Sequence, residues 1–100
     1  MRLSSETQQA ITGLFQKYFP EGRLYLFGSR VDDQARGGDI DLLCEQAGDP
    51  DILVKKKIAF LVELEKVIGE QKVDFIIYRP EGHTHSSIAE IAKKTGVRLV

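Results

Sequence analysis

Short runs of apolar residues, bounded by glycine, proline or charged residues, recur along this chain. Three of them predict buried strands, at residues 24–27, 39–44 and 73–78. The last apolar residues, 97–100, are expected to form a final strand or a packed tail. Between the first two strands, the polar residues 29–38 have room for one or two helical turns before paired glycines force a loop.

Other stretches repeat their apolar residues at helical spacing. A first helix is expected to begin at a capping Ser4 or Ser5 and to end at Pro20, and a last helix is expected to run from Ser86 or Ser87 to near Gly96. Between them, a long helix is predicted over about residues 51–68. Its apolar residues are expected to form a broad core stripe made of Ile52, Leu53, Ile58, Leu61, Val62, Leu64 and Ile68.

The order of these elements predicts the fold class. Helix, strand, short helix, strand, helix, strand and helix follow one another, which favours an α/β fold (α+β in some schemes) with a small mixed sheet of about three strands covered by helices. A length of 100 residues with 42% hydrophobic residues suits one core and leaves no room for a second. We therefore expect a single domain over residues 1–100.

Charge and cysteine content narrow the function classes. Fourteen Lys and Arg against fifteen Asp and Glu leave a net charge of −1, which provides no basic field for non-specific binding of nucleic acid. The one cysteine, Cys44, lies in an apolar run, so we interpret it as a small buried hydrophobe in a reducing compartment. No signal peptide or membrane span is recognisable, and we expect a cytoplasmic protein without membrane partners.

The tripeptide Asp39-Ile40-Asp41 is the first candidate for chemistry. Alternation along a strand places both carboxylates on one face, with their Cα atoms about 6.6 Å apart. Two carboxylates directed at one point repel each other unless a cation lies between them, and hard oxygen ligands suit Mg²⁺. A bare Asp-x-Asp pair also fits a solvated edge strand whose acids point outward.

Gly28, Ser29 and Arg30 follow the first predicted strand. The missing side chain of glycine lets backbone amides approach a phosphate, the serine hydroxyl can donate to it, and the arginine adds a fixed positive charge. Taken alone, a Gly-Ser pair is also an ordinary turn, and an arginine is also an ordinary surface residue.

Asp74 lies inside the third predicted strand, whose other residues are almost all apolar. Burying an ionised side chain is costly, so a compensating group is expected. If this strand lies beside the second one, Asp74 can complete the cluster of acids and accept the proton of an incoming hydroxyl. An acid that faces solvent at a strand edge is the alternative.

Together, Leu26-Phe27-Gly28-Ser29-Arg30, Asp39-Ile40-Asp41-Leu42 and the later strand with Asp74 carry a family resemblance. In content and order, over residues 23–78, they resemble the minimal nucleotidyltransferases of the DNA polymerase beta superfamily, short domains that are often paired with HEPN proteins. The resemblance implies that Gly28 and Ser29 hold a triphosphate, that Asp39 and Asp41 bind two Mg²⁺ ions, and that Asp74 is the third acid.

The resemblance also implies a reaction and a partner. Relatives encoded beside HEPN toxins act as antitoxins and transfer AMP from ATP to a tyrosine hydroxyl of the toxin, so we expect a Mg²⁺-dependent protein adenylyltransferase with a HEPN partner. Two alternatives stay open: an antitoxin that neutralises its partner by binding alone, and a nucleotidyltransferase for RNA ends or a small molecule. The lack of a basic patch and of an acceptor domain weakens the last of these.

Several lesser features allow both a functional and a plain interpretation. The run Lys55-Lys56-Lys57 fits a docking patch for an acidic partner or a solvated helix face. His83 and His85 fit a metal site or a polar loop, and the loop is favoured because no ligand at zinc-site spacing accompanies them. Tyr78 and Arg79 are candidates for the border of the nucleotide site, although Tyr78 also suits core packing.

Overall fold

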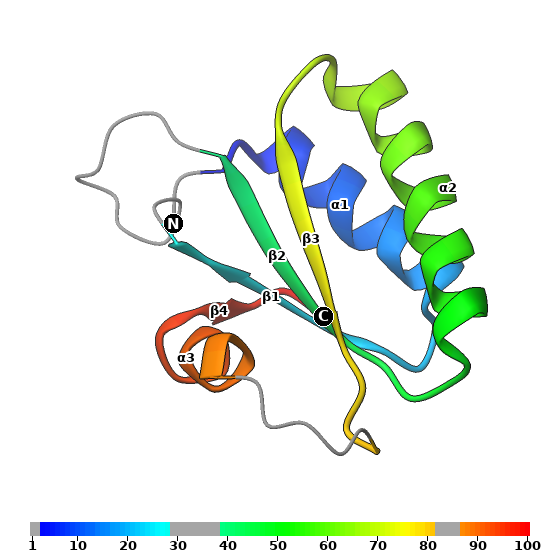
Figure 1. The fold of residues 1–100 in the computed structure, drawn as a ribbon. Coiled ribbons are helices and arrows are strands. Elements are labelled where there is room, and N and C mark those ends of the chain that lie inside the picture. The colour runs from blue at the N-terminus through cyan, green and yellow to red at the C-terminus, as the bar shows by residue number, and fades with distance from the viewer. Residues whose placement is uncertain (1–2, 29–38, 82–86) are drawn as a thin grey trace.

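The computed structural model describes residues 3–28, 39–81 and 87–100. The elements in these ranges follow one another along the chain as α1 (Ser5–Tyr18), β1 (Arg23–Phe27), β2 (Ile40–Glu45), α2 (Pro50–Ile68), β3 (Val73–Tyr78), α3 (Ser87–Thr95) and β4 (Val97–Arg98) (Figure 1). The predicted order of helices and strands is therefore confirmed for the elements within the described residues. The short helix expected within residues 29–38, together with His83 and His85, lies outside the described residues.

The strands form one mixed sheet in the order β3-β2-β1-β4. β1 pairs antiparallel with β2 and with β4, whereas β2 and β3 run parallel because α2 carries the chain from the end of one to the start of the other. Within the described residues the sheet therefore has four strands, one more than the three or so that the sequence predicted. The C-terminal residues pair with β1, where the Leu99 N–H donates to the Leu24 carbonyl at 2.7 Å and the Leu24 N–H donates to the Val100 carbonyl at 3.1 Å.

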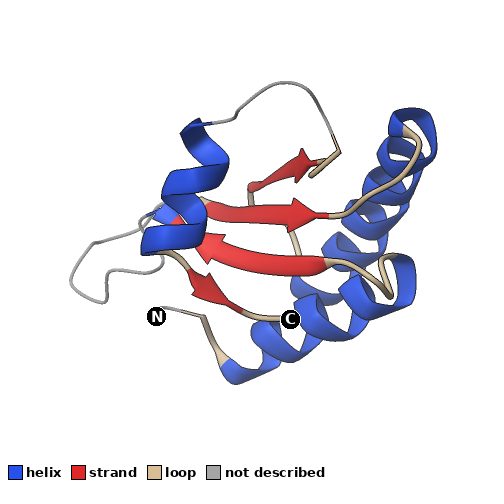
Figure 2. Cartoon of the chain, turned by 90° about the horizontal axis from the view of Figure 1, so that it is seen from below, coloured by secondary structure: helices blue, strands red, loops and turns tan. Residues whose placement is uncertain are grey.

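Helices cover both faces of the sheet (Figure 1, Figure 2). α1 and α2 cover one face. The core between these helices and the sheet contains a cluster of four aromatic rings whose neighbouring centroids lie 5.1–6.4 Å apart, namely Phe15, Phe19, Phe60 and Phe75. α3 covers the other face, where Ala89 and Ala92 pack against Tyr25 and Leu43. Alternation along each strand thus sends its side chains to two different cores.

The broad core stripe expected on α2 is wrong in part. Leu53, Phe60 and Leu64 are buried, but Ile52, Ile58 and Val62 are 53%, 57% and 50% exposed. The expected stripe also omits Phe60, which is fully buried among the aromatic rings. Apolar residues lie on almost every side of this helix, so its sequence does not indicate which side faces the sheet; the contacts do, and they bury the side that repeats at positions 53, 60 and 64.

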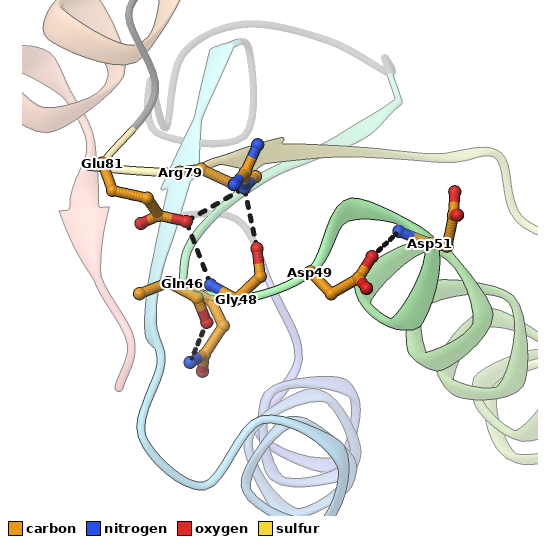
Figure 3. Close-up of polar contacts among 7 residues, drawn as sticks. Gln46, Gly48, Asp49, Asp51, Arg79 and Glu81 are labelled. Atoms are coloured by element: carbon orange, nitrogen blue, oxygen red, sulfur yellow. Dashed lines mark hydrogen bonds and ion pairs between the residues drawn. The ribbon is translucent and has the colours of Figure 1, made fainter.

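A polar clamp fixes the connection from β2 to α2 (Figure 3). Glu81 Oε1 accepts from the Gly48 N–H and from Arg79 Nε, each at 3.0 Å, and Arg79 Nε also donates to the Gly48 carbonyl at 2.8 Å. Asp49 then caps α2 by accepting from the Asp51 N–H at 2.8 Å. This clamp holds the C-terminal ends of β2 and β3, and so aligns the two strands at the end opposite to Asp41 and Asp74.

Cys44 is fully buried in β2, as expected for a small core residue. Burial raises the pKa of its thiol to about 12, so the reactive thiolate is suppressed at neutral pH. None of the helices within the described ranges combines the length and apolar character that a bilayer crossing requires.

Candidate active site

Three strands bring the predicted site residues to one end of the sheet. β1 ends at Phe27, directly before Gly28, β2 begins just after Asp39, and Asp74 is the second residue of β3. Because β1 is antiparallel to β2, Phe27 pairs with Asp41, and because β3 is parallel to β2, Asp41 pairs with Asp74. The expectation that the third predicted strand lies beside the second is confirmed.

Asp41 and Asp74 also share a face of the sheet. Their strand neighbours Ile40, Leu42 and Phe75 are buried in the core under α1 and α2, so alternation turns both acids to the face that α3 partly covers. The two acids are direct partners across the β2–β3 pair, so their carboxyl groups lie side by side on this face. Had Asp74 pointed to the α1 and α2 side, the two acids could not have shared a ligand.

Asp39 is held differently from the other two acids. It lies just before β2, opposite Lys72, which lies just before β3, and the Ile40 N–H donates to the Lys72 carbonyl at 3.1 Å. Across this junction, Lys72 Nζ lies 3.4 Å from Asp39 Oδ2. This ion pair with Lys72 is a feature that the sequence analysis missed, although an extended chain places residues 72 and 74 on the same face of the sheet.

Gly28 lies in close contact with the side chain of Asp41. Its φ of 76° lies in the left-handed region that favours glycine, and a Cβ atom built at this position would overlap Asp41 Oδ2. The absent side chain therefore leaves the space that the Asp41 carboxylate fills. Ser29 and Arg30, the other two predicted phosphate ligands, lie outside the described residues, and their roles stay predictions.

The surroundings of Asp41 raise the pKa of its carboxyl group. Partial burial contributes most, followed by the hydrogen bond with Asp74 and by the negative charges of Asp74 and Asp39, whereas the charge of Lys72 acts in the opposite direction. The pKa of Lys72 is raised in turn, chiefly by its hydrogen bond and charge interaction with Asp39. Together these groups form a concentrated negative site, which favours a bound cation.

This raised pKa gives an expected pH dependence for the metal-free protein. An acid that binds its proton more tightly in the folded state stabilises the fold below its ordinary pKa of about 3.9, and this contribution is lost as pH rises through the raised pKa. The free energy of unfolding of the parent should therefore fall, relative to that of Asp41→Asn, as pH rises from about 4 towards 7. Urea denaturation in chelator across this range measures it, and two parallel pH profiles would contradict the assignment.

The acids suit a hard divalent cation in donor type, since all three offer carboxylate oxygens. Across residues 3–28, 39–81 and 87–100, however, no three Asp, Glu, His or Cys side chains are grouped so that they could hold a metal ion. The strand register pairs Asp41 with Asp74, and Asp39 contacts Lys72. Asp39, Asp41 and Asp74 therefore remain predicted metal ligands.

A groove of about 720 Å³ opens beside the acids. Its volume lies within the range of small-molecule sites. Asp41 and Asp74 line it together with residues that the sequence analysis did not single out for the site, namely Phe27, Lys57, Leu61, Val73, Phe75, Ile76 and Ile91. Of these, Phe27 and Ile76 could have been found, because each is paired with or two residues away from an acid on the same face. The groove gives the carboxylates a largely apolar wall.

A family model for the nucleotidyltransferase domain matches residues 10–98, from within α1 to the end of β4. The chain belongs to the nucleotidyltransferase family. It is accordingly a transferase that moves a nucleotidyl group, as the sequence resemblance implied, and its mixed sheet with helices on both faces agrees with the nucleotidyltransferase fold. No sequence among the curated proteins matches this nucleotidyltransferase domain.

The structure also places Tyr78, Arg79 and the lysine run 55–57 relative to this nucleotidyltransferase site. Tyr78 and Arg79 lie at the C-terminal end of β3, roughly 13 Å or more along the strand from Asp74, so they do not border the acids. Tyr78 instead packs with the core under α3, which was the alternative interpretation. In the basic run, Lys56 lies over the Phe19 ring, 6.0 Å from its centroid, and Lys57 lines the groove.

Proposed function

We propose that this nucleotidyltransferase transfers AMP from ATP, with Mg²⁺, to a tyrosine hydroxyl of a HEPN partner protein and acts as its antitoxin. The observation that carries the proposal is the meeting of Gly28, Asp41 and Asp74 at one end of the sheet beside an open groove. A glycine corner that lets the backbone approach phosphates, beside acids that suit divalent cations, fits the metal-assisted in-line transfer of a nucleotidyl group.

Each residue has a distinct role in this proposal. Gly28 and Ser29 hold the triphosphate, and Arg30 adds positive charge beside it. Asp39 and Asp41 are the ligands for Mg²⁺, with Asp74 as the third acid, and the bound ions supply neutralisation of charge at the transferred phosphoryl group. Asp74 also accepts the proton of the attacking hydroxyl, since its carboxyl group lies at the groove and beside Asp41.

The exposed side of α2 supports a protein as the acceptor. Val54, Ile58 and Val62 are 47%, 57% and 50% exposed and follow one another every four residues, so they form a continuous apolar row. Leu61, which lies three residues after Ile58 and is therefore its neighbour on the helix surface, lines the groove that holds Asp41 and Asp74. Apolar surface that adjoins a catalytic groove is typical of a site where another protein docks.

Mass spectrometry tests the proposed reaction. The purified domain is incubated with ATP, Mg²⁺ and the HEPN protein encoded beside it, and one added AMP on a tyrosine of that protein is the expected result. Stoichiometric binding without modification, undiminished in an Asp39→Ala, Asp41→Ala variant, would favour an antitoxin that acts by binding alone. Label that appears only on RNA ends or on a small molecule would place the acceptor elsewhere.

A charge introduced on the apolar row is expected to weaken partner binding. Ile58→Glu should reduce affinity for the HEPN protein by at least about tenfold, because a carboxylate must then be desolvated at the contact. Ile52→Glu is the matched control, since Ile52 is 53% exposed on another side of the same helix. Titration calorimetry compares the two variants, whose melting temperatures should stay close to the parent's; equal affinities would place the partner on another surface.

A further inference from the structure

Lys72 and the three acids form a compact array at the start of β2 and β3. Asp39 faces Lys72 and Asp41 faces Asp74 across the parallel pair, so three carboxylates and one ammonium share a face of the sheet. Backbone and side chain both fix this register, through the Ile40 N–H to the Lys72 carbonyl and through the contact of 3.4 Å between Lys72 Nζ and Asp39 Oδ2.

The ammonium group of Lys72 pairs with Asp39, one of the acids that a divalent cation would need as ligands. In the described residues no three Asp, Glu, His or Cys side chains are grouped so that they could hold a metal, and one of the three acids, Asp39, contacts Lys72. The side chain of Lys72 is 70% exposed and that of Asp39 is 40% exposed, so the pair is weak and open to exchange. Lys72 can therefore leave Asp39 without breaking a buried contact.

We propose that Lys72 is a built-in counter-cation that holds Asp39 in the metal-free protein and must release it when a divalent cation binds. The inference rests on the proposed metal-dependent function. Lys72 opposes the metal in two ways, since its ammonium occupies Asp39 and its positive charge repels a second cation nearby. It is thus a positioning residue that sets metal affinity before nucleotide binds, and it keeps the three acids compensated until then.

Titration of Mn²⁺ in the absence of nucleotide, followed by the electron paramagnetic resonance signal of the free ion, tests this role. Lys72→Gln should bind Mn²⁺ about threefold to tenfold more tightly than the parent, because a competing charge is removed. Lys72→Arg keeps the charge and should bind like the parent. Lys66→Gln removes a charge from the last turn of α2 and controls for net charge alone, so it too should bind like the parent.

The outcomes separate this inference from the proposed function. If Lys72→Gln binds Mn²⁺ no more tightly than Lys72→Arg or Lys66→Gln, while all of them bind, Lys72 does not compete and the inference fails alone. If neither the parent nor Lys72→Gln binds Mn²⁺, or if Asp41→Asn binds it as well as the parent does, the metal site and the inference fail together.

Thermal melts distinguish this role from a purely structural one. In chelator, Lys72→Gln should melt a few degrees below the parent because three carboxylates lose their compensating charge. Saturating Mn²⁺ should close that gap or reverse it, whereas a deficit that persists with Mn²⁺ would show that Lys72 only stabilises the start of β3 and would overturn the proposal.

Discussion

Replacing Asp41 by asparagine is expected to reduce nucleotidyl transfer by about 100-fold to 1000-fold without loss of the fold. The carboxylate lies beside Asp74, fills the space left by Gly28 and lines the groove, so its charge acts where the triphosphate is proposed to bind. In chelator near neutral pH the variant should melt at or above the temperature of the parent, because a raised pKa marks a carboxylate whose ionised form is disfavoured in the folded state.

Asp51→Asn is the matched control for this experiment. It makes the same chemical change at an exposed residue in the first turn of α2, away from the acids, and should leave transfer unchanged. Transfer is measured from labelled ATP, and melting by circular dichroism. An Asp41→Asn protein that keeps parental activity, or that melts well below the parent in chelator, would show that Asp41 serves structure rather than catalysis.

Replacing Gly28 by alanine is expected to damage both stability and activity. A side chain at a φ of 76° is strained, and the new Cβ would overlap Asp41 Oδ2, so either β1 or the carboxylate must shift. The cost should be about 1–3 kcal/mol in the free energy of unfolding. Transfer should fall by at least about 100-fold, because displacing a catalytic group by an ångström is enough for that loss.

Gly13 offers the opposite case in the same chain. It lies inside α1, with nothing within 4 Å of an added Cβ, so Gly13→Ala should stabilise the protein by about 0.5–1 kcal/mol and leave transfer unchanged. Urea denaturation of both variants, with activity measured on the same samples, makes the comparison. If Gly28→Ala proves as stable and as active as Gly13→Ala, the close contact between Gly28 and Asp41 is not needed for stability or for transfer.

Local patterns in the sequence were enough to predict the central elements of the fold. The apolar run 73–78 coincides with β3, and Ser4 caps α1 as expected, because capping is a property of neighbouring residues. β4 was left open between strand and tail, since a two-residue strand is defined by its pairing with β1 and not by its own pattern.

The candidate site was predictable to the extent that it follows strand alternation. That the strand with Asp74 lies parallel to the strand with Asp41 could be predicted, because the intervening helix favours such a crossover, but the register that pairs these two acids could not. The contact between Lys72 and Asp39 depends on the register of that pairing, and a shift of one residue would have placed the two side chains on opposite faces. Which side of α2 stays exposed depends likewise on packing against α1 and the sheet.

Parallel pairing also decides when the site comes into being. β2 and β3 cannot meet until the whole of α2 has been laid down between them, so the chain brings Asp41 to Asp74 only after a long crossover has closed. A partly folded or incomplete chain therefore carries the acids but not their arrangement. A ligand that needs both Asp41 and Asp74 can therefore bind only after β3 has paired with β2.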